Sequence, residues 1–298
     1  MADHAPVLHM ISPLTQVSPF DVNMAFDAGY ANVAPYPHVT LDEVRGLTQD
    51  MMFSRPPQAA PRTGLFIGGR DASLALDMAE AARAALFPPF EISIFPDPSG
   101  AFTTAAAMIA KVEKQLSGPR HGGLQGADVK VFGATGIIGS IAAIIAAQAG
   151  ARVTLVSHRG LMAVELKAAE FKQRFGVDLA CDAAESDAEK AMLLAGSEVV
   201  LSAGRAGVEI LPAAALATAG RLLVAADVNA VPPSGIAGIG AYDDGSALAH
   251  GAGVGIGPLA IGDLKYRVQH MLLQRLRTTS RALYLDLGAI FALARELA

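Results

Sequence analysis

Lysine is absent from the first 110 residues of the chain, and Lys111 is the first. The 298 residues include a single cysteine, Cys181, which excludes an internal disulfide. Cys and His do not gather at zinc-ligand spacing, so we predict no metal site. With 23 Lys and Arg against 28 Asp and Glu, the formal net charge of −5 provides no basic stripe for a phosphate backbone, and nucleic acid is not an expected partner.

Long apolar runs are lacking as well. The longest, Ile137–Ala147, is interrupted by Ser140 and is shorter than the roughly 20 residues that a membrane-spanning helix needs. We interpret it as a buried helix and expect no membrane partner. A charged and then apolar leader is also missing, because Asp3, His4 and Pro6 interrupt the start, and we expect a cytoplasmic protein.

What is present is an alternation of strand and helix signals. Short apolar runs are followed by helix caps and Ala-rich segments, which is typical of a parallel α/β unit. In the first part of the chain, the predicted strands are Val7–Ile11, Leu65–Ile67 and Ile92–Phe95. Helices are predicted to start at Ser18 (with Pro19 and Asp21 in the first turn), at the Thr40–Glu43 capping box, at Asp71 and after Gly100.

A glycine-rich segment, 117–126, follows, and we place a domain boundary there. Beyond it, four apolar strands separated by helical stretches predict a doubly wound, Rossmann-type parallel sheet. These strands are Val129–Phe132, Val153–Val156, Val199–Leu201 and Leu222–Ala225, and two final helices are predicted at Leu264–Leu276 and Arg281–Leu297. The predicted fold is α/β, with a parallel α/β substrate domain (1–118 plus 270–298), a dinucleotide-binding domain (119–269) and a cleft between them.

Three glycines at Gly133, Gly136 and Gly139 directly follow a predicted strand and open a predicted helix. Glycine lets the backbone turn tightly and lets a pyrophosphate approach the amides at the helix N-terminus, where the helix dipole favours negative charge. The segment therefore predicts a dinucleotide site that includes Thr135 and Ile137. A tight turn without a ligand is the alternative.

The predicted second strand of that domain ends in Ser157, His158 and Arg159, beginning 24 positions after Gly133. In NAD-binding proteins an acidic residue ordinarily lies there and binds the ribose hydroxyls. A hydroxyl, an imidazole and a guanidinium instead provide donors for a 2′-phosphate, so we expect NADP to be accepted, with NAD as well. Alternatively, Arg159 is a solvated residue at a strand end.

Small and polar residues also follow the two later predicted strands. Because ligands collect at the carboxyl ends of parallel strands, these loops are where we expect the nicotinamide, although each is also compatible with an ordinary turn. The residues concerned are Ser202, Ala203, Gly204, Ala206 and Gly207 in the first loop, and Asp227, Val228 and Asn229 in the second.

Longer motifs carry a family resemblance that covers essentially the whole chain. They are SPFDVNMA at 18–25, FSRPPQ at 53–58, TGLFIGG at 63–69, DPSGAFTT at 97–104, DVNAVPPSGIAGI from Asp227 and GAGVGIGPLAIGDLK from Gly251. The chain resembles the NAD(P)-dependent methylene-tetrahydromethanopterin dehydrogenases of methylotrophs, distant cousins of the methylenetetrahydrofolate dehydrogenase/cyclohydrolases. It is more similar to the form that accepts both NAD and NADP than to the strictly NADP-dependent form.

The resemblance implies an oxidoreductase of one-carbon metabolism, acting in formaldehyde oxidation. Its reaction takes a hydride from the methylene carbon that bridges two nitrogens of tetrahydromethanopterin and leaves a methenyl cation delocalised over both. No proton has to move, so positioning matters more than acid–base chemistry. Relatives also suggest a homo-oligomer.

By the same resemblance, Asp21 is expected to contact the pterin, Thr103 and Thr104 to line the substrate cleft, and Lys265 to contact substrate. Each has a structural alternative. Asp21 is at the N3 position of its helix, where a carboxylate can cap the helix by accepting a hydrogen bond from the backbone at the N-terminus. The threonines could bond only backbone, and Lys265 could be solvated.

The missing lysine bears on a second activity. The bifunctional folate enzymes carry Tyr-x-x-x-Lys in their first domain, where the lysine serves the cyclohydrolase step. Tyr30 and Tyr36 are not followed four residues later by lysine, so we expect no cyclohydrolase activity. Two rival functions remain at this point: the same hydride transfer on methylenetetrahydrofolate, and a non-catalytic protein that senses NADPH.

Overall fold

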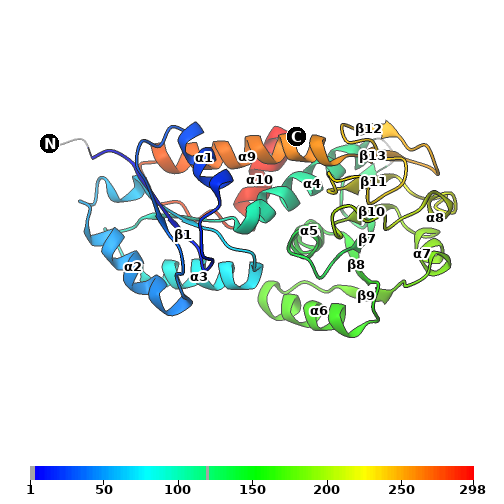
Figure 1. Ribbon diagram of the computed structural model, residues 1–298, viewed down its shortest axis with the longest axis horizontal. Helices are drawn as coiled ribbons and strands as arrows, with labels where there is room; N and C mark the ends of the chain where they lie inside the picture. Colours follow the sequence, from blue (N-terminus) through cyan, green and yellow to red (C-terminus); the bar gives the residue numbers. More distant parts are fainter. Residues whose placement is uncertain (1–3, 119–120) are drawn as a thin grey trace. The chain divides into compact units, whose positions relative to one another are not determined.

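The computed structural model describes residues 4–118 and 121–298, which divide into two compact units (Figure 1). The first unit is Met1–Thr103 with Tyr266–Leu293, and the second is Thr104–Lys265 with Ala294–Ala298. The division falls inside three helices, α4 (Ala101–Leu116), α9 (Pro258–Thr278) and α10 (Leu287–Leu297). The assignment of one domain to substrate and one to dinucleotide stays a prediction.

The first unit is built on a parallel four-stranded sheet with the strand order β2-β1-β3-β4. Its strands are β1 (Val7–Ile11), β2 (Val33–Tyr36), β3 (Thr63–Ile67) and β4 (Ser93–Pro96). Its helices are α1 (Pro19–Asp27), α2 (Leu41–Phe53), α3 (Ala72–Ala85), most of α9 and most of α10 (Leu287–Leu297), with short 3-10 turns at Ala60–Arg62 and Pro98–Gly100.

Local sequence signals explain these elements. Glu43 and Thr40 form the predicted capping box at the start of α2, and the Asp71 carboxylate accepts a hydrogen bond from the Leu74 amide at the start of α3. All five residues of β3 are buried, as expected for the centre of a sheet covered on both faces. Residues of β1, β3, α2 and α3 share one apolar core.

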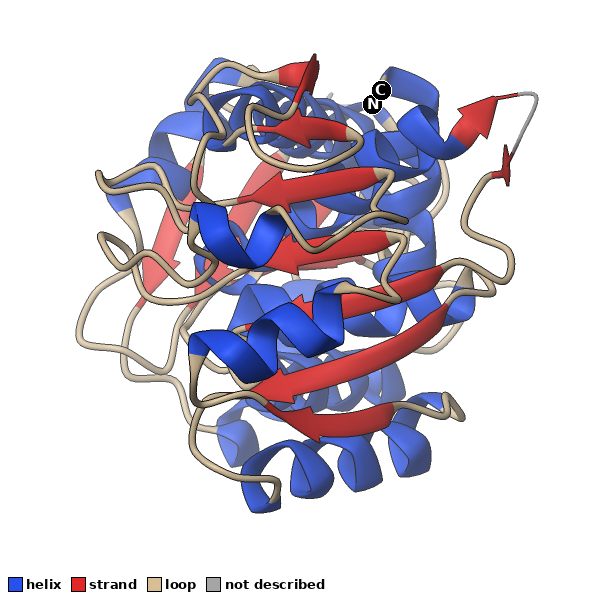
Figure 2. Ribbon diagram, turned by 90° about the vertical axis from the view of Figure 1, so that its right-hand side faces the viewer, coloured by secondary structure: helices blue, strands red, loops and turns tan. Residues whose placement is uncertain are grey.

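The second unit contains a seven-stranded sheet with the strand order β12-β13-β11-β10-β7-β8-β9, seen in Figure 2. Its strands are β7 (Asp128–Phe132), β8 (Arg152–Ser157), β9 (Ala180–Ala183), β10 (Val199–Ser202), β11 (Val224–Asp227), β12 (Asp244–Ala247) and β13 (Val254–Ile256). Only the pairing of β12 with β13 is antiparallel. Without β12, the order is that of a Rossmann sheet. The predicted α/β class with parallel sheets is therefore confirmed.

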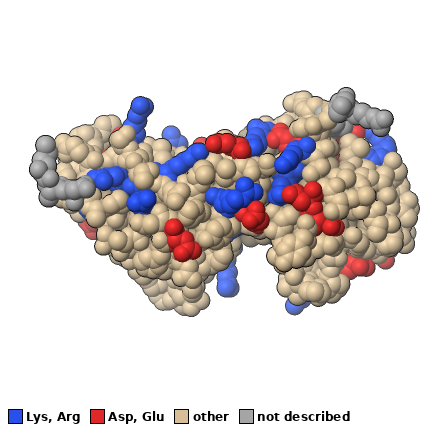
Figure 3. All heavy atoms as spheres, turned by 90° about the horizontal axis from the view of Figure 1, so that it is seen from above, with Lys and Arg blue, Asp and Glu red and all other residues tan. Residues whose placement is uncertain are grey.

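Helices α5 (Ile137–Gln148), α6 (Met162–Phe175), α7 (Asp187–Leu194) and α8 (Ala213–Leu216) connect these strands. The apolar run of the sequence forms α5, most of which is buried, as predicted. Across the described ranges, no helix combines the length and the apolar character needed to cross a bilayer. On the face drawn in Figure 3, basic and acidic side chains are interspersed.

Several elements differ from the prediction. Strands β2, β9, β12 and β13 were not expected, and α9 starts six residues before the predicted Leu264. The predicted helix from Arg281 is wrong in its first part, since α10 begins at Leu287. Residues before it run beside β4: the Ile94 amide donates to the Leu283 carbonyl at 2.8 Å, and the Leu285 amide donates to the Ile94 carbonyl at 2.9 Å. Pairing with this edge strand stabilises an extended conformation there.

The glycine-rich segment forms two short antiparallel strands, β5 (Ser117–Gly118) and β6 (His121–Gly122). The residues between them, 119 and 120, lie outside the described ranges, so the predicted boundary after residue 118 falls partly on them.

Candidate active site

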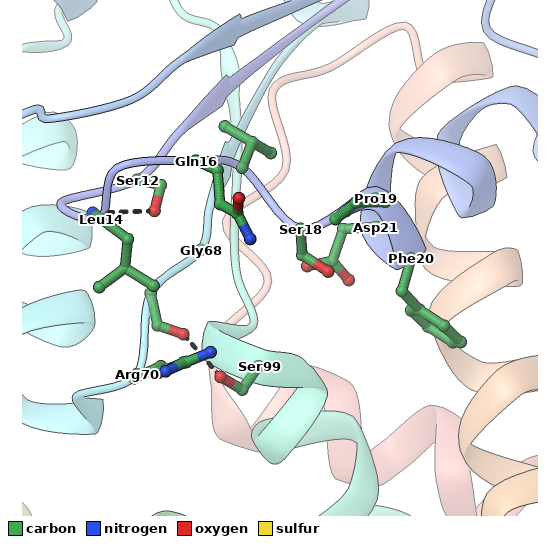
Figure 4. A pocket seen from close by; sticks show the side chains of 12 residues that line it. Ser12, Leu14, Gln16, Ser18, Pro19, Phe20, Asp21, Gly68, Arg70 and Ser99 are labelled. Carbon is green, nitrogen blue, oxygen red and sulfur yellow. Dashed lines mark hydrogen bonds between the residues drawn. The ribbon is translucent and has the colours of Figure 1, made fainter.

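A pocket of about 320 Å³ lies in the first unit, at the carboxyl ends of its strands (Figure 4). Ser12 and Leu14 follow β1, Gly68 to Arg70 follow β3, and Ser99 follows β4. The remaining lining comes from the loop before α1 and from its first turn: Gln16, Val17, Ser18, Pro19, Phe20 and Asp21. This is the edge of an open parallel sheet where ligands ordinarily bind.

Asp21 is the acidic residue of this pocket and is 3% exposed. Nε2 of Gln269, on α9, donates a hydrogen bond of 2.8 Å to Oδ1 of Asp21. Figure 4 shows the side chains of Asp21 and Ser18 extending from the start of α1 in the same direction. A buried carboxylate is stable only when it is hydrogen-bonded or paired, and Gln269 contributes one such bond.

Arg70 contributes a positively charged group to the pocket, and Ser99 contributes a hydroxyl. The Arg70 guanidinium is exposed and has no hydrogen bond or ion pair within residues 4–118 and 121–298. Ser99 has a φ of 54°, and its hydroxyl donates to the Gly69 carbonyl at 2.8 Å, which connects the loops after β3 and β4. The pocket thus presents a carboxylate, a guanidinium and several hydroxyls, a set that suits a ligand with both donors and acceptors.

Thr103 lies at the start of α4 and is fully buried. Its hydroxyl donates to Oδ2 of Asp97 at 2.7 Å, while the amides of Phe102 and Thr103 donate to Oδ1 at 2.9 and 3.1 Å. The Asp97 carboxylate therefore caps α4, and Thr103 reinforces that cap. The Thr103 hydroxyl thus binds a side-chain carboxylate and not only backbone, and Thr103 is not part of the pocket lining. Its role toward substrate stays a prediction.

Thr104 and Lys265 belong to the second unit. Thr104 is half-buried on α4, and Lys265 is buried on α9 with 9% of its surface exposed. Because Lys265 is buried, the alternative that it is a solvated surface lysine is wrong. The roles of both residues toward substrate stay predictions.

In the second unit, the glycine turn lies between β7 and α5. Gly133 has a φ of +77°, and a Cβ there would overlap the carbonyl of Ala203, so only glycine fits. The Ala203 amide donates to the Phe132 carbonyl at 2.9 Å, which holds the loops after β7 and β10 together. These two loops flank the switch point of the sheet, where dinucleotides bind in such folds.

Gly136 caps the N-terminus of α5, and Ile137 is the first helical residue. The first amides of a helix have no partner within it, so those of Ile137 to Gly139 are oriented to bind an anion. A Cβ at Gly139 would overlap the Gly133 carbonyl, so a side chain does not fit there. Thr135, which precedes Gly136, is exposed. The cradle fits the pyrophosphate of a dinucleotide.

The residues after β8 differ in exposure. Ser157 is buried, and its hydroxyl accepts a hydrogen bond from the Arg159 amide at 3.1 Å. The side chains of His158 and Arg159 are exposed, and the Arg159 guanidinium has no partner in the part of the chain that the structure describes. Two cationic or donor groups are therefore available for a phosphate at this position.

Asp227 and Asn229 hold the loop after β11. The Asp227 carboxylate accepts hydrogen bonds from the amides of Asn229, Gly235 and Ile236 at 3.1, 2.6 and 3.2 Å. Burial raises the pKa of the Asp227 carboxyl, and these amides oppose that shift. Oδ1 of Asn229 accepts from the Gly207 amide at 3.1 Å, which links this loop to the one after β10. Ser202 is buried there, whereas Ala203 and Gly204 are half-buried and Ala206 is exposed.

Sequence reasoning missed part of the pocket. Ser12, Arg70 and Ser99 each follow a strand, so the rule that ligands collect at carboxyl ends could have identified them. Gln269 gives no such signal, because it is one of two glutamines on a long helix and lies 248 positions from Asp21.

Comparisons with known proteins agree with this architecture. The family model described as "Methylene-tetrahydromethanopterin dehydrogenase, N-terminal" matches residues 19–99. The NAD(P)-dependent methylenetetrahydromethanopterin dehydrogenase of Methylorubrum extorquens is 46% identical over 293 residues, covering 98% of each chain. The Bifunctional protein MdtA of the same organism is 33% identical over 281 residues, covering 94% of this chain and 95% of its own.

Among solved structures, shikimate 5-dehydrogenase from Listeria monocytogenes, in complex with shikimate and NAD, has a TM-score of 0.51. It is 13% identical, and the match covers 97% of this chain and 96% of that one, so the likeness shows the fold alone. The identity to the first curated relative over nearly the full length is decisive: the chain belongs to the methylene-tetrahydromethanopterin dehydrogenase family.

Proposed function

We propose that this protein transfers a hydride from methylene-tetrahydromethanopterin to NAD or NADP and releases the methenyl form, as a step of one-carbon metabolism. The observation that carries the proposal is the 46% identity, over 98% of each chain, to a relative described as an NAD(P)-dependent methylenetetrahydromethanopterin dehydrogenase. The dinucleotide cradle around Gly133 and the mixed-polarity pocket around Asp21 supply sites of the required kinds.

In this proposal the pocket of the first unit binds the pterin. Asp21 presents a negative charge, which favours the positive charge that develops on the substrate as the hydride leaves. Arg70 and the Ser12 hydroxyl provide donors for the carbonyl and other acceptor groups of the pterin, whereas the Ser99 hydroxyl, which donates to the Gly69 carbonyl, can accept a hydrogen bond. Because no proton has to be moved, these residues act by orienting and stabilising the substrate.

The second unit would hold the dinucleotide. When bound, the nicotinamide supplies a hydride acceptor. The amides at the start of α5 bind the pyrophosphate, and His158 with Arg159 offers donors to the 2′-phosphate of NADP. A carboxylate that would repel this phosphate is absent from positions 157–159, so both cofactors can be accepted.

We further propose that the protein does not hydrolyse the methenyl product. Ala34 and Thr40 stand four residues after Tyr30 and Tyr36, where a lysine would be needed. Tyr30 is also buried, and burial raises the pKa of its hydroxyl.

Cytoplasmic location and assembly as a homo-oligomer complete the proposal. Cell fractionation tests the location, and light scattering of the purified protein tests the oligomeric state.

The direct test is to mix the protein with methylene-tetrahydromethanopterin and NADP or NAD and to follow the absorbance of the reduced nicotinamide. We expect turnover with both cofactors and a stoichiometric accumulation of the methenyl product. Tight NADP binding without turnover would contradict the proposal and favour a sensor of NADPH.

A further inference from the structure

Asp21, which lines the pocket, forms a buried hydrogen-bonded pair with Gln269, which is not part of the lining. Gln269 has no exposed surface, Asp21 is 3% exposed, and the distance from Nε2 to Oδ1 is 2.8 Å. Both residues belong to the first unit. A donor placed on one carboxylate oxygen limits rotation of the carboxyl group and so fixes the direction in which the other oxygen accepts hydrogen bonds.

We propose that Gln269 is a positioning residue, which holds the Asp21 carboxylate in the orientation that substrate needs. This inference rests on the proposed function. Misplacement of a binding group by about 1 Å can cost roughly a hundredfold in rate, so a fixed orientation matters most in a reaction that depends on positioning.

The type of side chain at position 269 also fits this role. A neutral amide binds the carboxylate and leaves its full negative charge in place. Lysine or arginine at this position would supply a donor too, but its positive charge would offset the charge that favours the methenyl cation. Glutamine therefore orients Asp21 without reducing its electrostatic effect.

The test variant is Gln269→Met, which keeps the length and approximate volume of the side chain and removes the donor. We expect kcat/KM for methylene-tetrahydromethanopterin to fall about tenfold or more, as for loss of a hydrogen bond to a charged group, and the KM for NADP to stay unchanged. Gln269→Asn, in which the amide is one methylene shorter, is expected to lose activity in the same way and serves if Gln269→Met does not fold.

Tyr266→Phe is the matched control. The Tyr266 hydroxyl donates to Oδ2 of Asp27 at 3.3 Å, so it also joins α9 to α1 but does not touch Asp21. If loosening of α1 from α9 were the cause of the loss, Tyr266→Phe would lower kcat/KM similarly. We expect it to keep wild-type kcat/KM.

A double-mutant cycle distinguishes positioning from general stability. Because Gln269 acts through Asp21, the variant that combines Asp21→Ala with Gln269→Met should be no less active than Asp21→Ala alone. Multiplicative losses, or wild-type kcat/KM in both Gln269 variants, would overturn the inference. Full activity of Asp21→Ala would overturn it while leaving the proposed function intact, whereas an inactive wild-type protein would overturn both.

Discussion

Gln269 on α9 donates a 2.8 Å hydrogen bond to Asp21 on α1, across 248 positions of the sequence. The family model that matches residues 19–99 includes Asp21 but not its partner. A helix near the end of the chain thus binds a residue of the pocket lining, although it contributes no lining residue itself. The pocket around Asp21 consequently depends on residues from both ends of the sequence.

Replacing Asp21 should affect the pterin and not the dinucleotide. We expect Asp21→Ala to lower turnover of methylene-tetrahydromethanopterin about tenfold or more, because a charge that favours the transition state is removed, and to leave the Kd for NADP unchanged. Steady-state kinetics and fluorescence titration with NADPH measure the two effects. Asp27→Ala removes an exposed carboxylate from the same helix and should keep full activity. A fully active but less stable Asp21→Ala would identify Asp21 as a helix cap.

Replacing Arg159 should separate the two cofactors. Its guanidinium is exposed and unpaired within the described ranges, and only NADP carries the additional phosphate. We expect Arg159→Ala to raise the KM for NADP about tenfold or more, as for loss of a charge-assisted hydrogen bond, with a much smaller effect on the KM for NAD. Equal changes in both constants would show that Arg159 does not discriminate between the cofactors.

Replacing Gly133 should destabilise the second unit. An alanine there combines a positive φ with overlap on the Ala203 carbonyl, so we expect Gly133→Ala to lower the free energy of unfolding by more than about 2 kcal/mol and to weaken NADP binding. Gly176 also has a positive φ, of 69°, but a Cβ there has no neighbour within 4 Å. Gly176→Ala therefore isolates the backbone strain and should cost only about 1 kcal/mol. If urea unfolding showed a similar loss of free energy of unfolding in Gly133→Ala and Gly176→Ala, the close approach of Gly133 to Ala203 would not be the cause.

The stability of the first unit should depend on the protonation of His9. Burial, and to a smaller extent the charge of Arg55, lower the pKa of His9 below its usual value of 6.5. The unfolded chain therefore binds a proton more readily, so this contribution to stability is present above pH 6.5 and is lost as the pH falls through the folded pKa. We expect unfolding free energies of His9→Gln to fall less steeply below pH 6.5 than those of the wild type. If the unfolding free energies of His9→Gln and of the wild type changed in parallel with pH, this prediction would be wrong.

The sequence predicted most elements whose local signals are strong. Val7–Ile11 and the Thr40–Glu43 capping box were predicted with the correct boundaries, because apolar strands and helix caps are encoded by adjacent residues. Strand β2 was missed because its four residues include Pro35 and lie at the edge of the sheet. The segment before Leu287 was predicted as helix because its pairing partner, β4, is distant in sequence.

The candidate site was predictable to a similar degree. The glycine turn and the residues after β8 follow from spacing, whereas Asp21 required the family resemblance. The role of Thr103 toward substrate also comes from the resemblance and stays a prediction; in the structure its hydroxyl donates to the Asp97 carboxylate, which caps α4. Gln269 could not be predicted at all, since nothing near it in sequence indicates a buried carboxylate as its partner.

The proposed substrate is a derivative of tetrahydromethanopterin and not of tetrahydrofolate. The most direct measurement compares kcat/KM for methylene-tetrahydromethanopterin and methylenetetrahydrofolate, with the same enzyme preparation and saturating NADP. We expect the methanopterin to be oxidised at least about tenfold more efficiently, a difference of roughly 1.4 kcal/mol in transition-state stabilisation. A preference of tenfold or more for the folate would contradict it.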